Sequence, residues 1–299
     1  MKGASQARSE KQRTLGFIGA GTVGTALAVR LSQSRYPVIA VYSRSRRSAQ
    51  RMADAISGCT VYDSAQTIAD NADVTFITTP DDAIGQVASS VRWRRGQGVV
   101  HCSGADSVAI LEPARQFGAL VGGFHPLQTF ASVEYAIENT PGSTFAIEAE
   151  EPLLTLLQDM ATALGGRWVR LTSGNKVLYH AAAVIACNYL VTLTSLSTDL
   201  WHAFGVQRPE STQALLPLLR GTLNNIEKVG LPDCLTGPIA RGDIGTIDKH
   251  IKALQLSAPD MLPIYCDLGL KTIPIALAKG KVDEKRTREI TKLLKERVP

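Results

Sequence analysis

Several features are scarce in this 299-residue chain, and each absence excludes a class of protein. Its five cysteines are scattered and form no Cys-x-x-Cys pair, which argues against a disulfide framework or a zinc site and indicates a reducing cytoplasm. Aromatic residues make up only 6% and are spread out, so the net charge of +5 does not indicate a nucleic-acid-binding surface. No apolar run reaches the roughly 18 uncharged residues of a membrane-spanning helix, so no membrane role is expected.

What is present is the composition of an ordinary globular protein. Hydrophobic residues make up 44% and charged residues 20%, and the length is sufficient for two domains. The first residues are polar and basic and lack the apolar segment of a secretory signal, so residues 1–12 are interpreted as a solvated tail.

Short β-branched runs alternate with helical stretches such as 24–33, 47–56 and 152–164 from residue 13 to residue 172. Strand alternating with helix predicts a parallel sheet that is covered on both faces. This part is therefore predicted to be an α/β, doubly wound Rossmann domain. Its expected strands are residues 15–19, 38–42, 74–78, 98–102, 120–123, 144–147 and 168–171.

From residue 173 to residue 299 no convincing strand remains, and apolar residues recur at helical spacing. The pattern predicts an all-α C-terminal domain for substrate binding and dimerisation. Its long first helix offers a large face, from which we expect a homodimer. The expected helices are residues 173–204, 210–228, 246–256, 259–278 and 283–297, and Pro217 should bend or split the second.

A glycine-rich turn follows the first predicted strand. The strand leads into Gly19-x-Gly21-x-x-Gly24 and then into an alanine-rich helix. In a dinucleotide-binding unit such glycines allow a tight turn, close approach of the backbone to a pyrophosphate and packing of the helix on the strand. The helix N-terminus also favours the phosphate charge. The expected phosphate-binding residues are Gly19, Ala20, Gly21, Thr22, Val23 and Gly24.

The residues after the second predicted strand favour NADP over NAD. NAD-specific folds place an acidic residue about 20 residues beyond the glycines. At that position this chain has no carboxylate and instead has Ser43, Arg44, Ser45 and Arg47. Hydroxyl and guanidinium groups suit a 2′-phosphate through charge-assisted hydrogen bonds. The alternative is that Arg44, Arg46 and Arg47 only begin a solvated helix.

Chemistry is expected where polar residues follow the predicted strands, because ligands of open parallel sheets bind beyond the carboxyl ends of the strands. Thr79 and Pro80 follow one strand and should border the cofactor. Ser103 and Gly104 follow the next strand, where a hydroxyl is expected to reach a substrate.

Two histidines accompany these strand ends. His125 is placed in the loop after the strand at 120–123, where its imidazole is expected to contact a substrate near the nicotinamide. The alternative for His125 is a hydrogen bond within its own loop. His101 is interpreted as a structural histidine at a strand end.

The long predicted helix carries polar residues among apolar ones. Lys176 and His180 are four residues apart and so lie on one face, and Asn188 lies close to that face. A lysine beside a bound carbonyl is able to donate a proton as hydride arrives, so Lys176 is the expected donor. The alternative is a solvated Lys176 near the start of the helix.

A further polar cluster covers residues 236–243. Its guanidinium group suits a carboxylate, so Arg241 is the candidate for binding a substrate carboxylate. The alternative is a loop between helices in which Arg241 pairs with Asp243.

Together these residues resemble a known family. The N-terminal unit, His-Pro-Leu-Gln-Thr-Phe at 125–130, Lys176-x-x-x-His180, Asn188 and Gly-Pro-x-x-Arg-Gly-Asp at 237–243 are similar to Rossmann-like proteins with an uncharacterised helical C-terminal domain. These proteins are relatives of the 6-phosphogluconate, β-hydroxyacid and prephenate dehydrogenases, and some are thought to act as ketopantoate reductases. The resemblance covers nearly the whole chain after residue 13.

The resemblance also implies roles for single residues. Lys176-x-x-x-His180 is similar to the Lys-x-x-x-Asn of β-hydroxyacid dehydrogenases and ketopantoate reductases, whose lysine is the acid–base group, although His180 replaces the asparagine. The stretch 122–126 looks like the Gly-Gly-His-Pro of prephenate dehydrogenases, whose histidine contacts the substrate hydroxyl, and Ser103 matches a serine of that family. The helical half does not resemble a prephenate dehydrogenase dimerisation domain.

These observations predict a cytoplasmic NADPH-dependent oxidoreductase that reduces a small 2-oxo acid, with ketopantoate as the first candidate. The expected catalytic residues are Lys176, His125, His180, Ser103 and Asn188, with Gly104 and Arg241 contacting the substrate. One alternative is a prephenate-like or pyrroline-5-carboxylate-like oxidoreductase. Another is an NADP-binding regulatory protein that catalyses no reaction.

Overall fold

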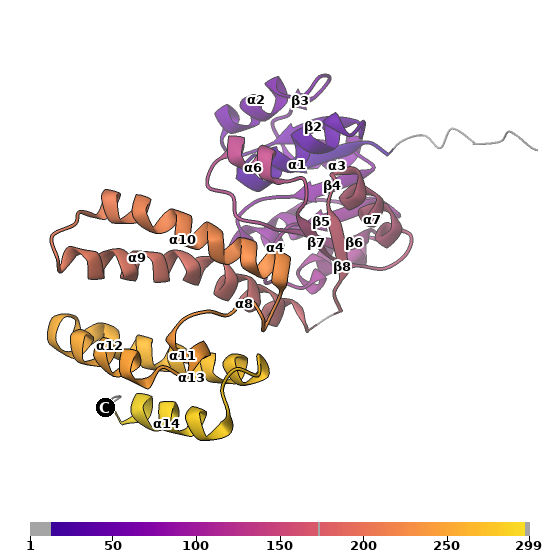
Figure 1. The fold of residues 1–299 in the computed structure, drawn as a ribbon. Helices are drawn as coiled ribbons and strands as arrows, with labels where there is room; N and C mark the ends of the chain where they lie inside the picture. The colour runs from indigo at the N-terminus through magenta and orange to yellow at the C-terminus, as the bar shows by residue number, and fades with distance from the viewer. Residues whose placement is uncertain (1–12, 173, 297–299) are drawn as a thin grey trace, which may run out of the picture. The chain divides into compact units, whose positions relative to one another are not determined.

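The computed structural model describes residues 13–172 and 174–296, and the chain divides into two compact units, Met1–Cys187 and Asn188–Pro299 (Figure 1). The expected tail at 1–12 lies outside the described residues. The units meet in sequence at residue 187 rather than at the expected 172, because the helix that begins at Lys176 stays with the first unit.

The described part of the first unit contains an eight-stranded sheet of order β3-β2-β1-β4-β5-β6-β7-β8. The order reverses next to β1, as in doubly wound folds, which confirms the predicted fold class. Its strands are β1 (Leu15–Ile18), β2 (Val38–Tyr42), β3 (Thr60–Val61), β4 (Val74–Ile77), β5 (Gly98–His101), β6 (Leu120–Leu127), β7 (Thr144–Ala149) and β8 (Arg167–Arg170).

The sheet departs from the sequence prediction in three places. The two-residue strand β3 was not predicted. Strand β7 runs antiparallel to β6, so the sheet is mixed rather than wholly parallel, because alternation of strand and helix does not fix the direction of each strand. Strand β6 continues to Leu127, so His125 lies within a strand and not in the loop expected there.

Helices cover the sheet of the first unit, and each face has its own buried cluster. Successive residues of a strand point to opposite faces, so Phe17 and Phe76 pack in one cluster while Ile18 and Ile77 pack in the other. The Phe17 and Phe76 rings stack with their centroids 5.1 Å apart. The helices are α1 (Thr22–Gln33), α2 (Arg46–Asp54), α3 (Ala65–Asn71), α4 (Asp81–Ser90), α5 (Glu112–Gln116), α6 (Val133–Asn139), α7 (Leu153–Ala163) and α8 (Lys176–Ala186), with the 3-10 helix η1 at Val108–Leu111.

The described part of the second unit is helical throughout, as predicted. A core of aliphatic residues, including Ile247, Ile251 and Ile290, holds its last helices together. Its helices are α9 (Asn188–His202), α10 (Arg208–Val229), α11 (Pro238–Arg241), α12 (Ile244–Ser257), α13 (Leu262–Ala278) and α14 (Glu284–Lys295), with the 3-10 helix η2 at Pro259–Met261.

One helix prediction needs correction, and one of the two alternatives in another, the splitting of the second helix at Pro217, is excluded. The single helix expected over 173–204 is divided at Cys187 into α8 and α9. Helix α10 continues through Pro217 as one element, so the proline does not split it. A proline removes one backbone hydrogen bond, and the remaining bonds of this 22-residue helix maintain the element.

Two helical stretches, Lys176–His202 and Pro259–Ala278, are long and apolar enough to cross a membrane when judged by length and composition alone. Both stretches contain polar or charged residues, so neither is the uninterrupted apolar run that the sequence lacks. In the first stretch, none of the residues in the most apolar window are buried. In the second stretch, 22% of the corresponding window is buried. Core helices of globular proteins pass the same test, so this is weak evidence for a membrane.

Candidate active site

The glycine-rich turn after β1 has the geometry that a dinucleotide requires. Gly19 has a φ of 110°, and a Cβ there would lie 2.6 Å from the carbonyl carbon of Thr78. A Cβ at Gly24 would lie 2.3 Å from the Thr78 hydroxyl, so this glycine allows α1 to approach β4. A Cβ at Gly21 would meet no atom within 4 Å. Its backbone is therefore open to a pyrophosphate at the N-terminus of α1, where no side chain caps the helix.

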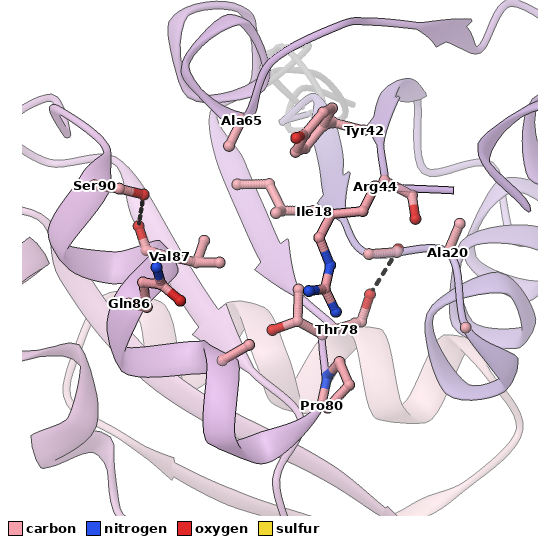
Figure 2. A pocket seen from close by; sticks show the side chains of 15 residues that line it. Ile18, Ala20, Tyr42, Arg44, Ala65, Thr78, Pro80, Gln86, Val87 and Ser90 are labelled. Atoms are coloured by element: carbon pink, nitrogen blue, oxygen red, sulfur yellow. Dashed lines mark hydrogen bonds between the residues drawn. The ribbon is translucent and has the colours of Figure 1, made fainter. Parts of the chain in front are cut away.

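A hollow of about 380 Å³ lies beside this turn, and we call it the nucleotide hollow (Figure 2). Seven of the predicted cofactor residues line it: Gly19, Ala20, Gly21, Ser43, Arg44, Thr79 and Pro80. Thr78, which precedes Thr79 in the segment expected to border the cofactor, lines it too. Residues not predicted from the sequence complete the lining: Ile18, Tyr42, Ala65, Ala83, Gln86, Val87 and Ser90. This lining combines apolar side chains with hydroxyl and amide groups and one guanidinium, which suits the adenosine part of a dinucleotide.

The predicted arginines differ in their placement. The Arg44 side chain extends into the nucleotide hollow toward Thr78 (Figure 2). Arg46 forms an exposed ion pair of 2.5 Å with Asp63, and Arg47 is an exposed residue of α2 that does not line the hollow. Ser45 caps α2 by accepting a hydrogen bond from the backbone of Ser48. Of the predicted arginines, Arg44 is the one whose side chain lines the hollow.

The other predicted residues of this region lie in the first turn of α1. Thr22, Val23 and Gly24 begin that helix and do not line the nucleotide hollow. Their backbone N–H groups belong to the helix N-terminus, so any contact with phosphate would come from the backbone rather than from the side chains.

A second group of residues lies along the ends of β5, β6 and β7. In the strand register, His101 of β5 pairs with Gly123 of β6, and Gly123 pairs with Glu148 of β7. Residues paired in this way project from the same face of the sheet. The Lys176 ammonium group lies above the glycine, because a Cβ at Gly123 would be 2.8 Å from Lys176 Nζ, 3.4 Å from His101 Nε2 and 3.7 Å from Glu148 Cβ.

Lys176 is the central ionisable group of this cluster. Its side chain is only 2% exposed, and its Nζ atom lies 3.5 Å from His101 Nε2. Burial lowers the pKa of Lys176 to about 8, and the carboxylate of Glu148 is foremost among the groups that oppose this shift. A lysine with this pKa exists in both protonation states near neutral pH, which is what proton transfer requires.

Two imidazoles beside Lys176 are held in the neutral form. Burial first, and then the charge of Lys176, lowers the pKa of His101 to about 3 and that of His125 to about 4. The backbone N–H of Ser103 donates to His101 Nδ1 at 3.2 Å. From this hydrogen bond we assign the His101 proton to Nε2, which faces Lys176.

His125 and His180 form the polar wall next to Gly104. A Cβ at Gly104 would lie 2.5 Å from His180 Nδ1 and 2.8 Å from His125 Nε2. The Nδ1 atom of His125 is hydrogen-bonded to the Tyr179 hydroxyl at 2.8 Å, and burial raises the pKa of Tyr179 to about 12. The Nδ1 atom of His180 is buried and has no hydrogen-bond partner among the described residues. A bound ligand could satisfy this atom, since burying an unpaired polar atom is unfavourable.

Ser103 is held by its own loop and by the start of α4. Its hydroxyl lies 2.8 Å from a carboxylate oxygen of Asp81 and 3.0 Å from one of Asp106, and it accepts a hydrogen bond from the Asp106 backbone. One hydroxyl proton serves two carboxylates, so the Ser103 proton is already engaged within the protein.

The remaining predicted residues belong to the second unit. Asn188 is exposed and begins α9. Arg241 ends α11 with a side chain that is 64% exposed, and its guanidinium lies 4.0 Å from the carboxylate of Asp243. This contact is the local pairing that the sequence analysis held as the alternative to a carboxylate clamp.

Three members of the cluster were not predicted as site residues: His101, Glu148 and Tyr179. His101 was interpreted as structural, and only the strand register places it beside Gly123. Glu148 could have been predicted from the sequence, because a charged residue in the apolar strand sequence Thr-Phe-Ala-Ile-Glu-Ala needs a specific partner when it is buried. No group of metal-ligating side chains that could hold an ion occurs within residues 13–172 and 174–296.

Two family models match the chain. A Rossmann-like domain matches residues 2–126, and a domain of unknown function, DUF2520, matches residues 143–272. The chain thus combines a Rossmann-like domain with an uncharacterised domain, as the sequence resemblance predicts. None of the curated proteins matches it.

Solved structures share the fold. A proposed NADP oxidoreductase from Bacteroides fragilis is 24% identical, with a TM-score of 0.71 over 88% of this chain and 98% of that one. A protein from Thermotoga maritima is 27% identical, with a TM-score of 0.63 over 95% and 97%. A reductive aminase from Aspergillus terreus, in complex with NADPH and ethyl-5-oxohexanoate, is 14% identical, with a TM-score of 0.60 over 96% and 93%.

The depressed pKa of His101 predicts a loss of stability in acid. An unfolded histidine binds a proton below about pH 6.5, whereas folded His101 stays neutral down to about pH 3. The folded state therefore loses about 1.4 kcal/mol for each pH unit below 6.5 on account of this residue. Urea unfolding between pH 7 and pH 4 should show a shallower acid dependence for His101→Gln than for the wild type. The exposed His202→Gln is the control, and parallel losses in wild type and His101→Gln would contradict the prediction.

Proposed function

We propose that this protein is an NADPH-dependent reductase that reduces the carbonyl group of a small 2-oxo acid. The observation that carries the proposal is the buried Lys176, whose pKa of about 8 allows it to donate a proton near neutral pH. Strongly perturbed ionisable groups in a polar cluster are typical of catalytic sites. A protein that only binds NADP would gain nothing from burying this lysine, so the regulatory alternative is less well supported.

The nucleotide hollow is the proposed NADPH site. The backbone at Gly19 and Gly21 and the N-terminus of α1 would hold the pyrophosphate, and Arg44 would pair with the 2′-phosphate. NADPH bound there would supply the hydride. The NADPH complex of a reductase with the same fold is consistent with this choice of cofactor.

Lys176 is the proposed proton donor. As hydride adds to the carbonyl carbon, the Nζ–H bond breaks and the proton passes to the carbonyl oxygen, which leaves an alcohol and a neutral lysine. His101 and His125 are neutral above about pH 4 and do not compete as cationic donors. His125 and His180 would instead orient the substrate through hydrogen bonds beside Gly104.

Ketopantoate is the first substrate to test, on the strength of the sequence resemblance. Its carboxylate needs a cationic or hydrogen-bonding partner, and Arg241 of the second unit remains the proposed clamp, with Asp243 as its competitor. Ser103 and Asn188 remain proposed site residues.

Reduction of a C=N bond is the second candidate, of the kind expected for a pyrroline-5-carboxylate-like enzyme. The carboxylates of Glu148, Asp106 and Asp81 all act on Lys176 and raise its pKa. Such an acidic surrounding favours a substrate that becomes positively charged, as a protonated imine does. A reductive aminase with the same fold is consistent with this chemistry.

A homodimer is the proposed assembly. Helices α9 and α10 of the second unit pack against each other and expose large apolar side chains: Tyr189, Val191, Leu218, Leu223, Ile226 and Val229. Extensive exposed apolar surface marks an interaction site. A second copy of the chain is the proposed partner for this surface.

Turnover assays test the proposed reaction. Purified protein with NADPH should reduce ketopantoate or another member of a panel of 2-oxo acids and cyclic imines. Lys176→Met should lower kcat by roughly 100- to 10,000-fold, whereas the exposed Lys285→Met should not. In the wild type, kcat/KM should be level below about pH 8 and fall above it, since reduction needs the protonated lysine. NADPH binding without turnover on the whole panel would instead support the regulatory alternative.

Cofactor selectivity tests the role of Arg44. Charge-assisted hydrogen bonds contribute about 1.5–3 kcal/mol, so Arg44→Ala should raise the Kd for NADPH roughly 10- to 100-fold and change that for NADH little. Arg47→Ala, which removes a charge outside the hollow, is the matched control. Fluorescence titration with both cofactors measures these constants. If Arg44→Ala lost affinity for NADPH and NADH equally, the result would contradict the proposal that Arg44 binds the 2′-phosphate.

Sedimentation velocity tests the assembly. The wild type should sediment at twice the mass of the chain, and Val191→Asp on α9 should shift it toward the monomer by placing a charge in the interface. Leu256→Asp on α12, a position that is 86% exposed, should leave the dimer intact. A monomer at every concentration would refute the proposal, and protein that stays dispersed only in detergent would point to a membrane.

A further inference from the structure

We propose that Glu148 is a positioning residue that holds Lys176 in its protonated, proton-donating form across the gap left by Gly123. The inference rests on the proposed function only where it concerns turnover. The arrangement of charges that supports it is a property of the folded chain itself.

The strand register supplies the geometry. His101, Gly123 and Glu148 form one row across β5, β6 and β7, and their side chains share one face of the sheet. The missing side chain in the middle of the row leaves a space, and Lys176 Nζ occupies it. The ammonium group is therefore flanked by an imidazole on one side and by the residue that carries a carboxylate on the other.

The carboxylate of Glu148 is itself fixed in place. The side chain is 5% exposed, and it accepts hydrogen bonds from the Ser107 hydroxyl at 2.9 Å and from the Val108 backbone N–H at 3.1 Å. These two hydrogen bonds fix the orientation of the Glu148 side chain, one at each carboxyl oxygen.

The other groups around Lys176 act in both directions. Burial disfavours the ammonium form of Lys176. The N–H group assigned to His101 Nε2 faces the ammonium group and also disfavours it, and His125 of β6 lies nearby. Asp81 at the start of α4 and Asp106 after β5 favour the ammonium form, but each acts less strongly than Glu148. Removing the charge of Glu148 should therefore shift the balance toward the neutral amine.

Nuclear magnetic resonance of protein labelled at the lysine side-chain nitrogen tests this without turnover. The Lys176 resonance is assigned by its loss in Lys176→Met and is then titrated against pH. The midpoint should lie near pH 8 in the wild type and about one to three units lower in Glu148→Gln. Glutamine has nearly the same shape and can still accept one of the two hydrogen bonds, so the fold should persist.

Glu150→Gln is the matched control. Glu150 follows β7 and lines the same surface hollow as Glu148, but its carboxylate is 89% exposed and pairs with Arg170. The substitution removes the same charge two residues away, so the Lys176 midpoint should stay at its wild-type value. Glu148→Asp keeps the charge and should move the midpoint by less than about half a unit.

The pH profile of kcat/KM gives the second readout. For Glu148→Gln the decline should begin at the lower midpoint. A shift of one unit gives roughly a fivefold loss at pH 8 that is recovered at about pH 6, and a larger shift gives a greater loss whose recovery needs a lower pH. An unchanged midpoint in Glu148→Gln, or equal shifts in Glu148→Gln and Glu150→Gln, would overturn the inference. If Glu148→Gln does not fold, a fall of one unit or more in Glu148→Asp would overturn it. A shifted midpoint in a protein that reduces no substrate would reject only the proposed function.

Discussion

The burial of one ammonium group links the elements of the first unit's polar cluster. A charge removed from water is tolerated only where other groups replace its hydration, and Lys176 is 2% exposed. Two features meet this need together: the gap at Gly123, which makes room for the ammonium group, and the carboxylate of Glu148, which favours its charge. The antiparallel course of β7 places Glu148 opposite Gly123, so the direction of that strand has a direct electrostatic consequence.

One short segment connects the nucleotide hollow with the polar cluster. Thr79 and Pro80 line the hollow, and Asp81, the next residue, begins α4 and accepts a hydrogen bond from Ser103. A change in the hollow that moved this segment would therefore also move a carboxylate that acts on Lys176. The proposed cofactor site and the proposed proton donor are thus linked by one piece of backbone at the carboxyl end of β4, where ligands of doubly wound sheets bind.

The features predicted correctly from the sequence are those that depend on the local pattern of residues. The glycine spacing after β1 and the apolar runs of the strands reflect backbone geometry and alternation, and they led to the correct fold class. Site residues that are brought together only by the strand register were harder to predict from the sequence. His101 was interpreted as structural and Glu148 was not predicted, because neither lies near Lys176 in the sequence. The division of the long helix at Cys187 was also missed, since no glycine or proline marks it.

Helix α8 presents different chemistry on its opposite sides. Lys176 is buried, while the adjacent Val177 and Leu178 are 68% and 76% exposed. If a second chain covers those apolar residues, assembly would also fix the rotation of the helix that carries the proposed proton donor. Dilution would then reduce the activity of each chain as well as the number of dimers, so that specific activity would depend on protein concentration.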